Sequence, residues 1–209
     1  MNLLQDAAKS VRLIAVSKGQ PVEKIVEAIA AGQIDFGENY AQELIEKAAV
    51  LREQKIEWHF IGHLQKNKIA KVLPVISWLH SLDSFELALT IDKKSSISIK
   101  CLLEIKLGDE FSKTGLTPDA AIELIPKLKN LRNIDLRGLM TIPPVSENPE
   151  AGRKYFRQLC LLLKEINSRY LYLSPLHELS MGMSRDFKIA IEEGATMVRV
   201  GTAFFGERV

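Results

Sequence analysis

The sequence of 209 residues has only two cysteines and no long apolar segment. Cys101 and Cys160 are too few for a disulfide scaffold or a structural zinc cluster, and their apolar neighbours predict small buried side chains. The longest strongly apolar run, at 159–163, is far too short to span a bilayer, so we expect no transmembrane helix. Residues 1–10 lack the basic start, apolar middle and small-residue cleavage site of a secretory signal peptide.

The sequence also lacks an excess of charge of either sign. Lysine and arginine total 28 against 26 aspartates and glutamates, a formal net charge of +2. This balance gives no reason to expect nucleic acid or an anionic membrane as a partner. Hydrophobic residues make up 46% and charged residues 26%, as in globular rather than disordered chains. We therefore expect a globular protein of the cytoplasm.

What the sequence does contain is an alternation of two hydrophobic periods. Between short β-rich runs, apolar residues recur at the helical spacing i, i+3, i+4 and i+7, as in Phe156, Leu159, Cys160 and Leu163. Pro118 stands where a first helical turn should begin, and glycines follow two of the helical patterns. The predicted strands cover residues 12–17, 34–37, 57–62, 76–82, 97–106, 134–141, 177–181 and 197–201.

Eight strands alternating with helices predict parallel pairing through right-handed crossovers. Two architectures compete, an eight-stranded (β/α) barrel and an open doubly wound sheet. The strand count favours the barrel, although such barrels more often have about 250 residues. The first strand ends in Ser17, Lys18 and Gly19, without the GxGxxG turn of a dinucleotide-binding sheet. We expect an α/β protein, a single-domain (β/α)8 TIM barrel over residues 1–209.

Lys18 is the sharpest candidate for chemistry, because functional side chains of barrels gather at the carboxyl ends of strands. The apolar residues 13–16 before it would partly remove its amine from water. Desolvation disfavours the ammonium form and leaves the amine free to form a Schiff base with a carbonyl. The alternative is an ordinary solvated lysine at the start of a loop, and position alone does not decide between the two.

The glycine- and serine-rich segments 180–184 and 201–202 are a second candidate. Phosphate sites in these barrels are commonly built from the loops after strands seven and eight. Glycines let backbone N–H groups approach an anion, and a helix beginning at Ser184 would add a favourable dipole. The alternative is a pair of ordinary strand-to-helix turns, which favour the same residues.

Other polar residues carry less information. The four histidines show no metal-ligand spacing, and His59, between two aromatic residues, is expected to be a hydrogen-bonded histidine of the core. Lys66, Lys68 and Lys71 on one predicted helix are better explained as a solvated face than as a binding patch. No Ser-His-Asp arrangement can be argued from the spacing.

Eight segments in a fixed order resemble a known family. In order, they are AVSK (15–18), GENYAQE (37–43), WHFIGHLQKNK (58–68), HSLD (80–83), FSKTG (111–115), RGLMTIP (137–143), LSMGMSRD (179–186) and VRVGTAFFG (198–206). They resemble the single-domain pyridoxal 5'-phosphate (PLP) binding proteins, also called PLP homeostasis proteins. That family is similar to the N-terminal barrel of bacterial alanine racemase. It usually carries a longer helical stretch before the first strand than residues 1–11 provide.

The resemblance implies roles for individual residues. Lys18 matches the lysine that holds PLP as an internal aldimine, so PLP is the implied cofactor, covalent on Lys18. Asn39 matches a polar residue of the second-strand motif near the cofactor. Arg199 matches the arginine that faces the pyridine nitrogen.

The implied phosphate-binding positions lie in the last two strand-end loops. Ser180 and the pair Gly201 and Thr202 match them, with help from the backbone around Met181 and Gly182. Each of these residues belongs to the two segments already singled out by their position after strands seven and eight.

The implied arginine also bears on catalysis. A guanidinium stays charged at physiological pH, so beside the pyridine nitrogen it disfavours protonation and leaves PLP a poorer electron sink. In the racemase relatives a tyrosine base comes from a second domain across a dimer, and we expect no such domain in this single-domain protein. The resemblance therefore implies a carrier or buffer of PLP in vitamin B6 and amino-acid homeostasis, without robust catalysis. Its partners would be PLP and PLP-requiring apo-enzymes, and it would be a monomer or weak dimer.

Two enzymatic alternatives stay open. A PLP-dependent amino-acid racemase would need a second acid/base group on the face opposite Lys18. A Schiff-base aldolase acting on a sugar phosphate would use the same lysine and phosphate loops without any cofactor.

Overall fold

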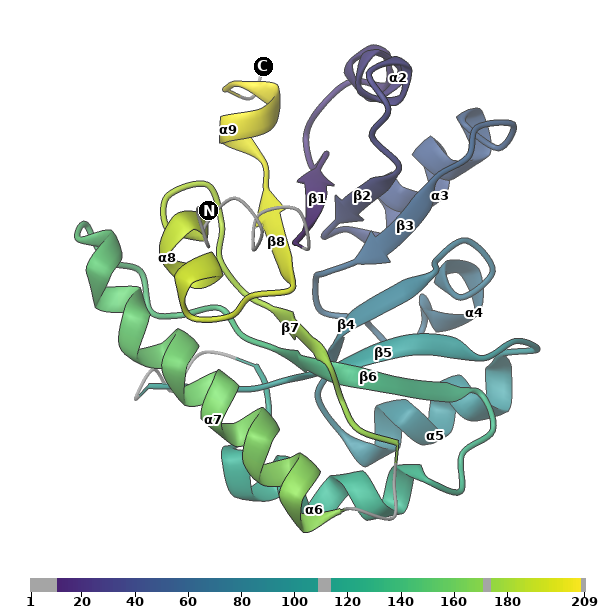
Figure 1. Cartoon of the computed structure of the whole chain (residues 1–209). Helices are drawn as coiled ribbons and strands as arrows, with labels where there is room; N and C mark the ends of the chain where they lie inside the picture. The colour runs from purple at the N-terminus through teal and green to yellow at the C-terminus, as the bar shows by residue number, and fades with distance from the viewer. Residues whose placement is uncertain (1–10, 109–113, 171–173, 208–209) are drawn as a thin grey trace.

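In a computed structural model of the chain, which describes residues 11–108, 114–170 and 174–207, eight parallel strands pair in chain order and close into a barrel (Figure 1). The strands are β1 (Arg12–Val16), β2 (Asp35–Glu38), β3 (Glu57–Phe60), β4 (Trp78–Leu82), β5 (Ile99–Glu104), β6 (Ile134–Met140), β7 (Glu178–Ser180) and β8 (Met197–Val200). Closure is made by β8 against β1. Each predicted strand overlaps one of these, and the predicted TIM barrel is confirmed.

Helices follow the strands and surround the barrel (Figure 1). They are α2 (Val22–Ala30), α3 (Ala41–Val50), α4 (Ile69–Val72), α5 (Phe85–Lys94), α6 (Pro118–Leu128), the 3-10 helix η1 (Pro149–Gly152), α7 (Arg153–Arg169), α8 (Phe187–Glu192) and α9 (Thr202–Phe205). Residues 1–10 and the first three residues of the FSKTG segment lie outside the described residues, so the expectations placed on them stay untested.

Local signals in the sequence set where several helices begin. Pro118 is the first residue of α6, where its missing N–H costs no hydrogen bond. Thr117 caps this helix by accepting a hydrogen bond from the backbone N–H of Ala120 at 3.2 Å. Ser84 caps α5 in the same way, accepting from the N–H of Leu87 at 3.3 Å.

The core has two parts. The larger cluster lies between the strands and the helices, and it contains the fully buried Cys101 with the half-buried Cys160 packed against it. The cysteine prediction is therefore confirmed for Cys101 and holds in part for Cys160. A smaller cluster joins five strands across the barrel interior: Ile14, Trp78, Leu102, Met140 and Met197. Side chains from so many strands can meet only inside the barrel, so its interior is packed rather than open.

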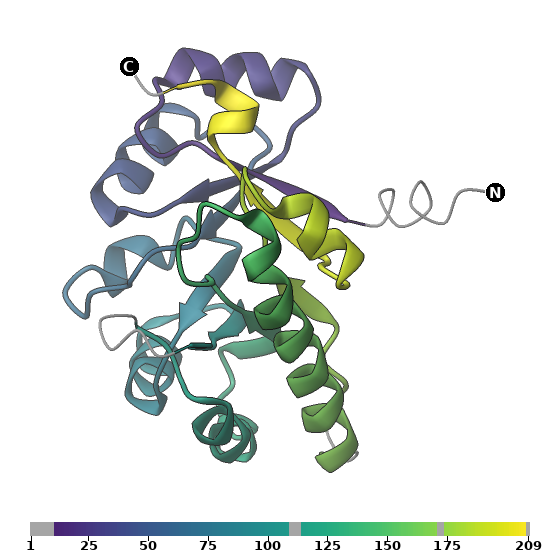
Figure 2. The ribbon, with the colours of Figure 1, turned by 90° about the vertical axis from the view of Figure 1, so that its left-hand side faces the viewer.

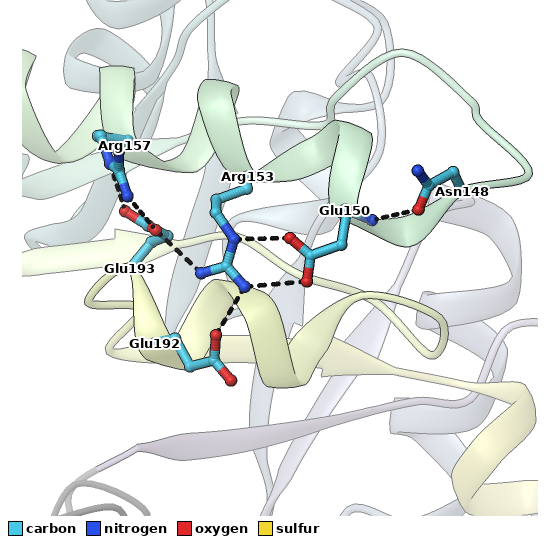
Figure 3. A network of polar contacts seen from close by, with 6 residues as sticks. All are labelled: Asn148, Glu150, Arg153, Arg157, Glu192 and Glu193. Carbon is cyan, nitrogen blue, oxygen red and sulfur yellow. Dashed lines mark hydrogen bonds and ion pairs between the residues drawn. The ribbon is translucent and has the colours of Figure 1, made fainter.

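An ionic network ties α7 to α8 (Figure 3). Arg153 donates to Glu150 at 2.7 Å, to Glu192 at 2.7 Å and to Glu193 at 3.0 Å, and Arg157 donates to Glu193 at 2.9 Å. Figure 2 shows α7 and α8 side by side. The network therefore links η1 and the beginning of α7 to the C-terminal end of α8.

Other expectations can be compared with the described residues. Lys66 and Lys71 are exposed and Lys68 is half-buried, which agrees with solvated side chains. The prediction that all three lie on one helix is wrong, because α4 begins at Ile69 and contains only Lys71. Across the described ranges, no helix combines the length and apolar character that a membrane crossing requires. The same residues hold no group of three or more side chains arranged to bind a metal ion.

Candidate functional site

A cavity of about 290 Å³ opens at the carboxyl ends of the strands. Its wall brings together Lys18 after β1, Asn39 after β2, and Arg199, Gly201 and Thr202 at the end of β8. These are five of the eight residues that the sequence predicts for the site. The loops after β6 and β7 add residues 142–146 and 183–186 to the wall.

Lys18 stands where the sequence places it, in the turn after β1, and it is half-buried in the cavity wall. Its Nζ lies 5.4 Å from the centre of the Tyr40 ring, within reach of a cation–π contact. Lys18 is the only lysine among the described residues of the wall. An amine nucleophile at this site would therefore come from Lys18.

A buried ionic cluster fixes the backbone on both sides of the site lysine. Lys47 of α3 donates from Nζ to the carbonyl of Ser17 at 2.6 Å, to Glu38 at 2.7 Å and to Glu43 at 2.6 Å. Glu43 also accepts a hydrogen bond from the backbone N–H of Gly19 at 2.6 Å. All three ammonium protons of Lys47 thus have acceptors. We call these five residues the Lys47 cluster.

Glu38 is the most deeply buried acid of the Lys47 cluster, with no exposed surface. Its Oε1 accepts from Lys47 and from the Ser17 hydroxyl at 2.7 Å, while its Oε2 has no hydrogen-bond partner among the described residues. Burial raises the pKa of Glu38, although Lys47 and Ser17 act to lower it. Sequence reasoning missed this cluster, and the i, i+4 spacing of Glu43 and Lys47 was its available signal.

Two backbone N–H groups converge on Ser184, a residue of the cavity wall. Those of Gly201 and Ala203 both point to the hydroxyl oxygen of Ser184, each at 3.3 Å. Such long contacts to one neutral oxygen leave capacity for a stronger acceptor, such as an anion. The expectation that a helix begins at Ser184 is wrong, because α8 begins at Phe187. The Asp186 side chain instead closes a turn by accepting from the N–H three residues earlier, at 2.7 Å.

The remaining three predicted residues are not among those of the cavity wall. Ser180 and Met181 are completely buried. Gly182 has a φ of +89°, and a Cβ there would lie 2.5 Å from that of Ala190, so only glycine fits. Its carbonyl accepts from the backbone N–H of Arg199 at 3.0 Å. The predicted contacts of these residues with a phosphate stay predictions.

A chain of hydrogen bonds crosses the barrel interior and ends at Arg199. Asp35 Oδ1 lies 2.9 Å from His59 Nε2, and His59 Nδ1 lies 2.9 Å from His80 Nε2. His80 Nδ1 lies 2.9 Å from the hydroxyl oxygen of Ser180, to which Arg199 donates from Nη1 at 2.5 Å. The prediction that His59 is a hydrogen-bonded histidine of the core is confirmed. We call these five residues the interior chain.

Arg199 is 3% exposed. Its Nη2 donates to the carbonyl of Thr141 at 2.9 Å. Burial lowers the pKa of Arg199 to about 10, opposed by the charges of Glu104 and Asp186. The guanidinium therefore keeps its charge at neutral pH and presents a fixed cation to the cavity.

Burial also lowers the pKa of both interior histidines, that of His80 well below its usual value. Asp35 acts in the opposite direction on His59, whereas the positive charges of Arg12 and Arg199 further disfavour a charged His80. The charges facing the pair are those of Arg12, Asp35, Glu57 and Arg199. Both rings are neutral in the folded protein at neutral pH.

These lowered pKa values predict a loss of stability in mild acid. In the unfolded chain both histidines titrate near pH 6.5, so below that pH the unfolded state binds more protons than the folded state. The free energy of unfolding should fall between pH 7.5 and 5.5, with a slope of up to about 1.4 kcal/mol per pH unit for each histidine. Urea denaturation at several pH values measures this slope.

The matched control for this prediction is His63→Gln, because the side chain of His63 is 57% exposed. That variant should keep the wild-type slope, whereas His80→Gln should reduce it. A free energy of unfolding that stays constant or rises from pH 7.5 to 5.5 would show that the interior histidines do not titrate as described.

The sequence profile of the family described as "Alanine racemase, N-terminal domain" matches residues 1–209. The chain belongs to this family. It is 44% identical over 200 residues to the pyridoxal phosphate homeostasis protein of Aquifex aeolicus, covering 94% of this chain and 87% of the relative. The protein of the same name from Vibrio cholerae is 41% identical over 209 residues, covering 97% of this chain and 87% of the relative. The resemblance to PLP homeostasis proteins is therefore confirmed.

Solved structures of the family have the same fold. PipY of Synechococcus elongatus without PLP has a TM-score of 0.90 and 39% identity, covering 98% of this chain and all of PipY. PipY with PLP bound has a TM-score of 0.88 and 38% identity over the same shares. The alanine racemase of Clostridium difficile has a TM-score of 0.69 and 16% identity, and covers 98% of this chain but only 54% of the racemase. At that identity the likeness extends to the fold alone.

Proposed function

We propose that this protein binds PLP reversibly through Lys18 and serves as a carrier or buffer of PLP in vitamin B6 and amino-acid homeostasis. The observation that carries the proposal is the convergence of an amine, a buried arginine and two backbone N–H groups on one cavity, from Lys18, Arg199 and the turn after β8. The homeostasis proteins of two bacteria and PLP-bound PipY, all about 40% identical, support the choice of PLP.

The cavity fits the charge of PLP. Its described wall holds three cationic side chains, those of Lys18, Arg185 and Arg199, against the single carboxylate of Asp186. This excess of positive charge suits a phosphate ester, which carries nearly two negative charges at neutral pH. The phosphate would bind where the N–H groups of Gly201 and Ala203 converge, beside Thr202 and Ser184.

The residues of the chain would divide the remaining tasks. PLP supplies an aldehyde that condenses with a primary amine with loss of water, and Lys18 offers that amine. The Lys47 cluster holds the carbonyl before Lys18 and the N–H after it, which limits the motion of the turn. Asn39 adds a polar group to the wall. The charged guanidinium of Arg199 can donate hydrogen bonds but cannot accept them. It would therefore donate to the ring nitrogen and disfavour protonation of that nitrogen.

The arginine also supports a role without robust catalysis. An unprotonated ring withdraws electrons poorly from a reacting amino acid. A racemase would compensate with a second base opposite Lys18. Among the described residues of the wall the only carboxylate is Asp186, which already accepts from the N–H of Met183. A cofactor-free aldolase is disfavoured by the PLP-bound relative PipY.

The proposal extends to the domain organisation, location, oligomeric state and partners of the protein. We expect one PLP-binding domain over residues 1–209, located in the cytoplasm and functioning as a monomer that at most dimerises weakly. Its partners would be free PLP and PLP-requiring apo-enzymes, with release when a recipient amine displaces Lys18. The near-zero net charge of +2 gives nucleic acid no electrostatic basis for binding.

The test is the absorbance spectrum of the purified protein titrated with PLP, followed by borohydride reduction and peptide mapping. We expect a visible band that borohydride removes, with the reduced pyridoxyl group on the peptide that contains Lys18. Incubation with amino acids should release PLP without interconverting their enantiomers. The absence of any band at saturating PLP would overturn the proposal and favour the aldolase, while rapid racemisation would favour the enzyme.

A further inference from the structure

We infer that Ser180 and His80 are positioning residues for Arg199, and that the Ser180 hydroxyl does not donate to the phosphate of the ligand. The inference rests on the proposed function, since Arg199 lies in the wall of the proposed PLP cavity. It concerns the interior chain, whose five residues run from Asp35 on β2 to Arg199 on β8.

The two ends of the interior chain determine the direction of every hydrogen bond in it. Arg199 can only donate, and the ionised carboxylate of Asp35 can only accept. His59 must therefore donate from Nε2 to Asp35, which leaves its Nδ1 as an acceptor for His80 Nε2–H. A neutral His80 then has a bare Nδ1 that must accept from the Ser180 hydroxyl. All four bonds point from Arg199 toward Asp35.

This direction uses the only proton of the Ser180 hydroxyl. Ser180 donates it to His80 and accepts from Arg199, so no donor remains for a phosphate oxygen. The residue is also fully buried and absent from the cavity wall. Ser184, by contrast, lies in the wall beside the converging N–H groups. Of these two serines, Ser184 is therefore the one that would donate to a phosphate.

The interior chain also orients the arginine. One guanidinium nitrogen of Arg199 is held by Ser180 and the other by the carbonyl of Thr141. Two bonds, one to Ser180 in β7 and one to the residue that follows β6, fix the plane of the group, as a single bond would not. Loss of the Ser180 oxygen would leave a buried donor on Arg199 and a buried acceptor on His80 without partners. The guanidinium would then be free to leave its position in the cavity.

The test compares PLP with pyridoxal, which has the same ring and aldehyde but no phosphate. We expect Ser180→Ala to weaken both ligands by the same factor, about tenfold, because the lost contact acts through Arg199 on the ring. The matched control is Ser184→Ala, which should weaken PLP and leave pyridoxal unchanged. Affinity is read from the visible band and from labelling fixed by borohydride.

Replacement of His80 separates positioning from folding. His80→Gln keeps one donor and one acceptor and should retain most of the affinity and the wild-type band position. His80→Leu keeps neither, and should shift the band because the ring nitrogen loses its fixed partner. If Leu and Gln variants bind PLP equally and give the same band, while only the melting temperature of the Leu variant falls, the chain is structural and the inference is wrong.

The proton assignment can be checked without any ligand. In the NMR spectrum of the ring nitrogens at pH 7.5, both His59 and His80 should carry a proton on Nε2 and none on Nδ1. The opposite tautomer on either ring, or a Ser180→Ala variant that weakens PLP but not pyridoxal, would overturn the inference while leaving the proposed function intact. Wild-type protein that binds neither ligand would overturn the proposed function, and this inference with it.

Discussion

Replacing Lys18 with alanine is expected to abolish covalent retention of PLP. Alanine has no amine, and no other lysine lies among the described residues of the cavity wall. The visible band should disappear and borohydride should fix no pyridoxyl group on the protein. The ring nitrogen would still find Arg199, and the phosphate would still find the N–H groups of the turn after β8, so weaker, non-covalent binding of PLP should remain. Absorbance, mass spectrometry after reduction and equilibrium dialysis measure these three quantities.

Two further variants make this result specific. Lys18→Arg keeps the positive charge but has no nucleophilic amine, so it should bind PLP without covalent retention. Lys66→Ala removes a lysine whose side chain is 75% exposed, and it should behave like the wild type. A pyridoxyl group fixed on Lys18→Ala to the same extent as on the wild type would place the reactive amine elsewhere and refute the assignment.

The second large effect is expected from Lys47→Met. Methionine fills a similar volume but leaves Glu38 buried without its cation, and breaking a buried ion pair in this way costs about 3–5 kcal/mol of folding free energy. The same change leaves the carbonyl of Ser17, next to the site lysine, without the hydrogen bond that it accepts from Lys47. We therefore expect a lower free energy of unfolding in urea and slower PLP loading in the protein that remains folded.

The double variant Glu38→Gln with Lys47→Met tests the cause of that loss. It removes the unpaired buried charge, so much of the stability should return, since neutral replacements of buried pairs are often tolerated. The exposed Lys71 offers the matched control, and Lys71→Met should change stability by less than about 0.5 kcal/mol. If Lys47→Met is as stable as Lys71→Met, the Lys47 cluster does not contribute as described.

Much of the site could be predicted because it follows from local pattern and topology. Lys18, Asn39 and Arg199 each stand at or just after the end of a strand, and parallel strands in a barrel bring those ends to one rim. To predict that they line one cavity, it is enough to know that eight strands form the barrel and that all of them run in the same direction. Ser180 also lies at a strand end, but the sequence does not say whether its side chain faces the cavity or the interior.

The sequence by itself determined the eight strands, the barrel, the family and the position of Lys18, because hydrophobic period and motif order are properties of neighbouring residues. Only the tertiary structure decided how buried polar groups are paired. The contacts of His80 with Ser180 and of Lys47 with Ser17 join residues 100 and 30 positions apart. Buried polar groups are almost always hydrogen-bonded, and their partners are the groups that the packed barrel places within about 3 Å. No local pattern encodes that choice.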